Sequence, residues 1–311
     1  MNFQPGDMFA YSLRTEDSGG VREGRLSIWA SETDAGHLHL LLSGDFAGIN
    51  FTTAAQGPVD DPMALFSNLG YAASQDLPYD PEQFVQFLFM VTWAFITFDD
   101  TILQVGFDDT VTTPHGGQFN VAVPEQTTVG GVEGYAVELS VAGEPSVIEV
   151  LYNPDLPLPV RGAITDEGFH IEASLKEYAK NRTAPDIPLP PRAHWQGVLH
   201  ELVYHLQSAG LEIGEVRPHD IRMMDATAAL SVTIDGHSPP AELYAFDPET
   251  TAESTLERVR AAADSGQMLI PEMSMEIPVV VHDQLMLSSV DYFGGDHHPN
   301  KDAIVESFLS F

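Results

Sequence analysis

The sequence predicts an α+β protein that begins with a curved antiparallel half-barrel carrying a helical insertion and ends with a small α+β sandwich. Two observations predict this fold. Hydrophobicity alternates with a period of two over most of residues 1–180. After a proline-rich segment, stretches with the apolar spacing of helices are interspersed with strand-like stretches. We expect a half-barrel over residues 1–180 with its insertion at 60–97, a linker over 181–194 and a second domain over 195–311.

Nine segments before residue 180 show the alternation of half-buried strands. Turn residues such as Ser18-Gly19-Gly20 and Gly130-Gly131 separate them, so consecutive strands are expected to pair in an antiparallel sheet. The predicted strands are residues 6–16, 22–32, 37–46, 50–56, 101–109, 117–125, 134–143, 146–154 and 168–180.

The insertion holds two predicted helices, "PMALFSNLG" and "PEQFVQFLFMVTW". Pro81 suits the first position of a helix, with Asp80 as its cap. The run Phe84–Phe98 is apolar at nearly every position, but it is shorter than the roughly twenty apolar residues of a membrane span. Because a helix that is apolar on most sides must be covered on most sides, we expect it against the concave apolar face of the sheet.

The segment "NRTAPDIPLPPRAHW" contains the predicted linker, since it is rich in proline and has no periodicity. After it, helix-spaced residues begin at Trp195, a hairpin turns at Asp235-Gly236, and a helix runs from Asp247-Pro248 to Gly266. The predicted order is α-β-β-β-α-β-β-α, with the helices on one face of an antiparallel sheet.

The chain is strongly acidic, with 13 Lys+Arg against 46 Asp+Glu and a formal net charge of −33. Such a surface repels phosphate backbones and anionic lipid headgroups, so we expect neither nucleic acid binding nor electrostatic membrane docking. Two interpretations of the acidity stay open: an acidic face for cations or a basic partner, and adaptation to high salt. The acids are scattered along the whole chain, which favours the halophilic interpretation.

The chain has no cysteine, which excludes disulfides, thiolate metal sites and cysteine nucleophiles. Its start, "MNFQPGDMFAYSL", lacks a basic segment followed by an apolar segment. Location in the periplasm or cell envelope after removal of a leader and location in the cytoplasm are therefore both open, and an integral membrane protein is not expected.

No phosphate-binding loop, dinucleotide fingerprint or nucleophile elbow is present, so no catalytic residue, metal ligand or cofactor is assigned. In "HELVYH" the histidines are five apart, about 140° around a helix, which does not fit the zinc-protease motif. His37 and His39 share one face of a predicted strand, a geometry that suits a metal but lacks a third ligand. The remaining candidates are a loop pair, His219-Asp220, and a turn cluster, Asp296, His297 and His298.

The aromatic stripe of the insertion is the candidate ligand-binding wall. It comprises Phe84, Phe87, Phe89, Met90 and Trp93. Such a stripe is usually hydrophobic core. Because these residues point in nearly every direction and include the adaptable Met90, they also suit the wall of an acyl-chain pocket.

The segment from "VEGYAVELSV" through "YNPDLPLPV" to "GFHIEASLKEY" resembles the closing part of bacterial lipoprotein carriers of the LolA/LolB class. The resemblance extends over about residues 1–180. It implies an incomplete antiparallel barrel whose hydrophobic concave side is closed by helices and accepts acyl chains, in a protein of the bacterial envelope. Residues 195–311, with "AGLEIGEV" and "ELYAF", resemble a small module of uncharacterised bacterial exported proteins, which implies no activity.

Three functional hypotheses follow. The first is a non-enzymatic envelope protein whose half-barrel holds an acyl chain or a lipidated segment. The second is a structural or protein-interaction protein with no small ligand and an unknown partner. The third is a hydrolase or isomerase whose histidine and carboxylate groups meet only in the fold.

We expect the melting temperature to rise between low and molar KCl, because screening reduces repulsion among the carboxylates. Thermal unfolding followed by circular dichroism measures this. Sucrose is the control, since it favours the compact state by exclusion without screening charge. A melting temperature that does not change with KCl would contradict the halophilic interpretation.

Overall fold

The computed structural model describes residues 3–32, 37–58, 62–78, 81–85, 87–88, 102–112, 118–129, 131–140, 147–166, 168–271, 274–291 and 297–311. The chain divides into two compact units, Met1–Ile187 and Pro188–Phe311. The division lies inside the proline-rich segment, and each unit is described by itself.

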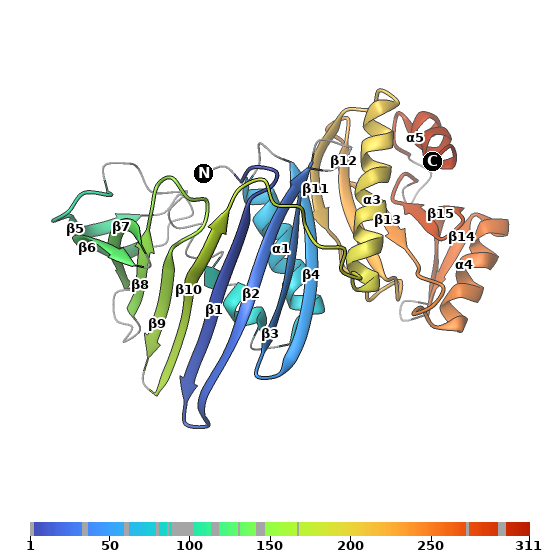
Figure 1. The fold of residues 1–311 in the computed structure, drawn as a ribbon. Helices are drawn as coiled ribbons and strands as arrows, with labels where there is room; N and C mark the ends of the chain where they lie inside the picture. Colours follow the sequence, from blue (N-terminus) through green and yellow to red (C-terminus); the bar gives the residue numbers. More distant parts are fainter. Residues whose placement is uncertain are drawn as a thin grey trace. The chain divides into compact units, whose positions relative to one another are not determined.

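The first unit is built on one open antiparallel sheet of ten strands in the order β4-β3-β2-β1-β10-β9-β8-β7-β6-β5 (Figure 1). Its edges are β4 and β5, which are consecutive strands of the sequence. The strands are β1 Met8–Asp17, β2 Gly20–Glu32, β3 His37–Phe46, β4 Ile49–Pro58, β5 Asp108–Thr112, β6 Gln118–Val129, β7 Val132–Ser140, β8 Val147–Tyr152, β9 Arg161–Asp166 and β10 Phe169–Ala179.

Alternation along β1 shows how the sequence determines the two faces of this sheet. Phe9, Tyr11 and Leu13 are buried, whereas the intervening residues are partly or fully exposed. The buried face carries the large hydrophobic core of the unit, and helix α1 (Pro62–Asp76) packs on it at β4. We call this the concave face and the opposite one the convex face. The curved, open sheet with helices on its concave face confirms the predicted half-barrel.

Two strand predictions in the first unit differ from the structure. Strand β9 was missed because "RGAITD" has a glycine and an alanine at its centre and no clear alternation. The strand predicted over 101–109 is wrong, since residues 102–107 form turns and β5 begins only at Asp108. Helix formation in the insertion is confirmed for α1 and for residues 81–85 and 87–88, while residues 89–97 lie outside the described residues.

The second unit has a six-stranded antiparallel sheet in the order β11-β12-β13-β16-β15-β14. Helix α3 begins at Pro191, so the predicted linker is shorter than expected. One strand, β14, was missed because it has only four residues. The elements are α3 Pro191–Ser208, β11 Ile213–Pro218, β12 Ala228–Ile234, β13 Ala241–Ala245, α4 Glu253–Ser265, β14 Gln267–Ile270, β15 Met275–His282, β16 Leu285–Ser288 and α5 Lys301–Leu309.

Two hydrophobic cores lie on opposite faces of this second sheet. Leu243 on β13 belongs to the core beneath α3 and α5, whereas its neighbour Tyr244 belongs to the core beneath α4. The prediction that the helices cover one face is therefore wrong. In "ELYAF", which includes most of β13, consecutive residues are apolar, so both faces of the strand carry apolar side chains. This pattern is typical of a strand that is covered on both faces. Gly266 ends α4 in the left-handed conformation at φ 70°, as its position in the sequence predicted.

Gly162 on β9 and Gly70 in α1 give a matched test of how closely the insertion packs on the sheet. A methyl group at Gly162 would lie 2.8 Å from the buried ring of Phe87, whereas one at Gly70 would meet nothing within 4 Å. We expect Gly162→Ala to destabilise the first unit by about 1–3 kcal/mol through overpacking. Gly70→Ala should be neutral or stabilise it by up to about 1 kcal/mol.

Urea unfolding of both variants measures the difference. If Gly162→Ala were as stable as wild type, the contact between Phe87 and the sheet would not be tight.

Candidate functional site

The concave face of the first sheet has a row of small side chains beneath the insertion. Across the strands, the register places Phe46, Gly24, Leu13, Ala173, Gly162 and Val150 in one line from β3 to β8. Glycine is required at two interior positions of this line. A Cβ at Gly24 would lie 2.7 Å from Cα of Phe46, and one at Gly162 would enter the Phe87 ring. The row forms a shallow trough into which a helix can pack closely.

Phe84 and Phe87, two of the predicted ligand-wall residues, lie over this trough. Phe84 is fully buried, with its ring centroid 5.1 Å from that of Phe46. Phe87 is also buried, and its ring covers Gly162. Residues three apart on one helix thus contact β3 and β9, which the sheet order separates by three strands. Phe89, Met90 and Trp93 lie outside the described residues.

Helix α1 covers the β4 side of the same face. Gly57 allows this, because a Cβ there would lie 2.8 Å from Cα of Leu65. The hydroxyl of Thr53, fully buried on β4, donates a hydrogen bond of 2.7 Å to the Asp76 carboxylate at the end of α1. The helix is therefore attached to the sheet by both apolar packing and a buried polar contact.

Tyr11 is another polar group of the concave face with a clear partner. Its hydroxyl donates a hydrogen bond of 2.7 Å to the carbonyl of Pro159, and the side chain is buried. Burial raises the pKa of Tyr11 far above its ordinary value, so the phenol remains neutral. It acts as a fixed hydrogen-bond donor and not as an acid or base.

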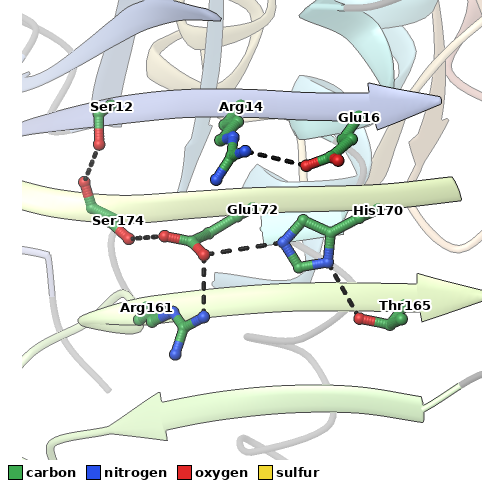
Figure 2. A network of polar contacts seen from close by, with 8 residues as sticks. All are labelled: Ser12, Arg14, Glu16, Arg161, Thr165, His170, Glu172 and Ser174. Carbon is green, nitrogen blue, oxygen red and sulfur yellow. Dashed lines mark hydrogen bonds and ion pairs between the residues drawn. The ribbon is translucent and has the colours of Figure 1, made fainter. Parts of the chain in front are cut away.

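The convex face carries a polar network over β1, β9 and β10 (Figure 2). Glu172 accepts hydrogen bonds from Arg161 at 2.8 Å and from Ser174 at 2.6 Å. His170 lies between Glu172, at 3.7 Å, and the Thr165 hydroxyl, at 3.0 Å. The order hydroxyl, imidazole, carboxylate has the form of a hydrolase triad. However, the carboxylate is already engaged by Arg161 and Ser174, so its geometry suits cross-strand pairing better than proton transfer.

The electrostatics of Glu172 agree with this interpretation. Burial raises its pKa, but hydrogen bonds from Ser174 and Arg161 and the positive charge of Arg161 outweigh that effect and hold the pKa below its ordinary value. Glu172 is therefore ionised at neutral pH and forms a partly exposed ion pair.

The histidines singled out in the sequence have separate contacts and form no common site among the described residues. His39 faces Ser31 on β2, and burial lowers its pKa. His205 contacts Ser310 at 3.1 Å, and the buried ring of His298 accepts a hydrogen bond from Asn300 N–H and contacts the carbonyl of Ile234. Within the described parts of the chain, no group of three histidine or carboxylate residues could hold a metal ion.

The predicted pair His219-Asp220 is divided between two partners. Asp220 pairs with Arg222, whose hydrogen bonds lower the pKa of Asp220 to about 2. His219 instead lies 3.6 Å from Glu242, which also accepts hydrogen bonds from Tyr244 and Ser288. His219 and Asp220 therefore do not form the acid–base pair considered in the sequence analysis.

Gly24 and Gly162 are the features of the site that sequence reasoning missed. Each occupies a strand position at which the alternating pattern predicts a large apolar residue. A glycine at such a position often indicates that another part of the chain packs closely against the strand. The signal was present for Gly24, within a recognised strand, but not for Gly162, whose strand was not recognised.

Comparisons with solved structures found similar folds at low identity. The complex of Pseudomonas aeruginosa MucA/MucB matches with 9% identity, over 91% of this chain and 87% of that one, at a TM-score of 0.31. A crystal structure of MucB matches with 10% identity over 76% and 74% of the two chains, at 0.27. A LolA superfamily protein from Nitrosomonas europaea matches with 11% identity over 60% of this chain and 90% of that one, at 0.22.

No protein-family model and no curated protein matches the sequence. One of these structural matches is thus a member of the LolA superfamily. At these TM-scores the likeness carries no argument about function, which has to come from the residues of this chain. Among the described residues, no helix is both long and apolar enough to cross a membrane.

We expect Glu172→Gln to reduce the loss of stability at acid pH. Because the folded-state pKa of Glu172 is lowered, its carboxylate contributes stability above the unfolded-state pKa and loses it as pH falls through the folded-state pKa. The contribution of such a partly exposed pair is at most about 1 kcal/mol. The urea midpoints of wild type and Glu172→Gln should therefore become more similar as the pH is lowered from about 6 to about 3.

Glu16→Gln is the control, since Glu16 forms an exposed ion pair with Arg14 on the same face. Equal pH profiles for wild type and Glu172→Gln would show that the network contributes nothing to stability.

Proposed function

We propose that this protein is a non-enzymatic binding protein of the bacterial envelope that holds a hydrophobic ligand, an acyl chain or a lipidated segment, on the concave face of the first sheet. The ligand-binding wall would include Phe84, Phe87, Phe89, Met90 and Trp93. The envelope location follows from the resemblance to lipoprotein carriers, and the binding mode follows from the way the concave face is covered.

The observation that carries the proposal is the path of the insertion. Strands β4 and β5 are consecutive in the chain but lie at opposite edges of the open sheet, so residues 59–107 connect one edge to the other. Contacts of Leu65 with Gly57, Phe84 with Phe46 and Phe87 with Gly162 trace this path from β4 to β3 to β9. Among the described residues, the concave face from β4 to β9 is therefore covered by helical residues of this connecting segment.

Such a cover suits reversible binding. A segment held on a sheet by side-chain packing can be displaced by a ligand that buries comparable apolar area. The surface beneath it is apolar, with Val121, Val123, Val137 and Val150 each at most 3% exposed. An acyl chain bound there would gain about 0.8 kcal/mol for each methylene group enclosed.

We expect the affinity for single-chain monoacylglycerols to increase about fourfold with each added methylene group until the concave face is filled, which is 0.8 kcal/mol expressed as a binding ratio. Isothermal titration calorimetry of protein stripped of co-purified lipid measures this. The heat-capacity change of binding should be negative, since apolar surface is buried. Native mass spectrometry of the unstripped protein should show bound acyl compounds.

Phe87→Ala is the informative variant. It should change affinity for monoacylglycerol because Phe87 lies over the trough, whereas Leu309→Ala removes an exposed apolar side chain in the second unit and should not. An affinity that does not depend on chain length, or no binding at all, would contradict the proposal and favour a structural or protein-interaction role.

A further inference from the structure

Thr15 of β1 has a buried hydroxyl group with no partner. Its side chain is 3% exposed, and the hydroxyl makes no hydrogen bond within the described part of the chain. Alternation along β1 places Thr15 on the concave face, in line with Phe9, Tyr11 and Leu13. Since buried polar groups nearly always find a hydrogen-bond partner, an unpaired hydroxyl at this position requires an explanation.

Other buried hydroxyls on the same face are paired. Thr53 donates to Asp76, and Tyr11 donates to the carbonyl of Pro159, both at 2.7 Å. The interior of this unit can therefore supply acceptors where the structure needs them. The unpaired hydroxyl of Thr15 is unlike these two, and an acceptor atom from outside the chain would satisfy it.

Arg22 lies directly opposite Thr15 on the neighbouring strand β2, and it therefore faces the same side of the sheet. The other arginines of the described strands in this unit, Arg14, Arg25 and Arg161, face the convex side. Arg22 pairs with Asp17 at 2.7 Å. A guanidinium group has five N–H donors, so it can bind a ligand carboxylate in addition to the contacts that it already makes.

The same row of the concave face continues as an apolar path. Across β10, β9 and β8, the residues in register with Thr15 are Ile171, Ile164 and Ile148. All three belong to the hydrophobic core or pack against it. One end of the row thus carries the guanidinium group of Arg22 and the hydroxyl of Thr15, and the rest of the row is apolar. This arrangement suits an amphiphile with a small anionic headgroup.

We propose that Thr15 and Arg22 bind the carboxylate of a single-chain amphiphile, a fatty acid, whose alkyl chain lies along Ile171, Ile164 and Ile148. This inference rests on the proposed function and adds the class of ligand. The Thr15 hydroxyl donates a hydrogen bond to the carboxylate, and Arg22 supplies the opposing charge. In a chain with a net charge of −33, anions are repelled in general, so a cation on the concave face is needed to admit one.

The test compares dodecanoate with monolaurin, which has the same alkyl chain and an uncharged head. Thr15→Val keeps the shape of the side chain and removes only the hydroxyl. We expect it to weaken dodecanoate binding roughly tenfold, the size of a hydrogen bond to a charged group. Monolaurin binding should change far less, and the melting temperature of the ligand-free protein should stay the same or rise, because an unpaired buried group has been removed.

Arg22→Gln should also weaken dodecanoate binding roughly tenfold and leave monolaurin binding unchanged, the loss reflecting a charge-assisted contact. Arg25→Gln is the matched control, since it removes the same charge from the same strand on the convex face, where Arg25 pairs with Asp45. It should affect neither ligand.

The outcomes separate the two proposals. If monolaurin binds and dodecanoate binds no more tightly, or if both variants bind dodecanoate like wild type, the headgroup site is wrong and the acyl-binding function stands. If neither amphiphile binds the wild-type protein, both proposals fall. A lower melting temperature for Thr15→Val would show that the hydroxyl has a structural partner.

Discussion

The fold of the first unit depends on one topological constraint: the two edges of its open sheet are adjacent in the sequence. The chain leaves the sheet at β4 and returns at β5, on the far edge, so the intervening segment has to cross. The described apolar residues Phe84, Val85, Phe87 and Leu88 of this segment are buried, as expected for side chains that pack on a hydrophobic face. On the sheet, glycines 24, 57 and 162 stand where other backbone or aromatic groups come close. A side chain at any of the three positions would collide with them.

The two faces of the sheet have different chemistry although they are built from the same strands. On the convex face, Arg161, Glu172 and His170 form a network that water partly screens, and such pairs add little stability. On the concave face, polar groups are few and buried, where each hydrogen bond made or missing matters more. The unpaired hydroxyl of Thr15 is significant for this reason, whereas a similar group on the convex face would be solvated.

The acidity of the chain has no single structural location among the described residues. The cations present mostly pair with nearby acids on the surface, such as Arg25 with Asp45 and Arg260 with Glu253. Most carboxylates remain in excess over any available partner. This distribution is the one that the halophilic interpretation expects, and binding on the concave face stays a proposal.

The sequence by itself determined most of the strands, the helical insertion, the proline-rich division and the burial of Phe84 and Phe87. These follow from local periodicity and from the simple rule that apolar side chains must be covered. It did not reveal β9 or the position of α4, because "RGAITD" has no alternation and strands apolar on both sides do not specify which helix covers which face.

Only the tertiary structure decided which residues meet across the sheet. Gly162 faces Phe87, and Thr15 lies opposite Ile171, because strand order and register bring them together. The pairing of β1 with β10 joins residues more than 150 positions apart, and no local pattern in the chain encodes it. Long-range register is set by the sum of packing over the whole sheet, and for that reason the candidate headgroup site could not be found from the sequence alone.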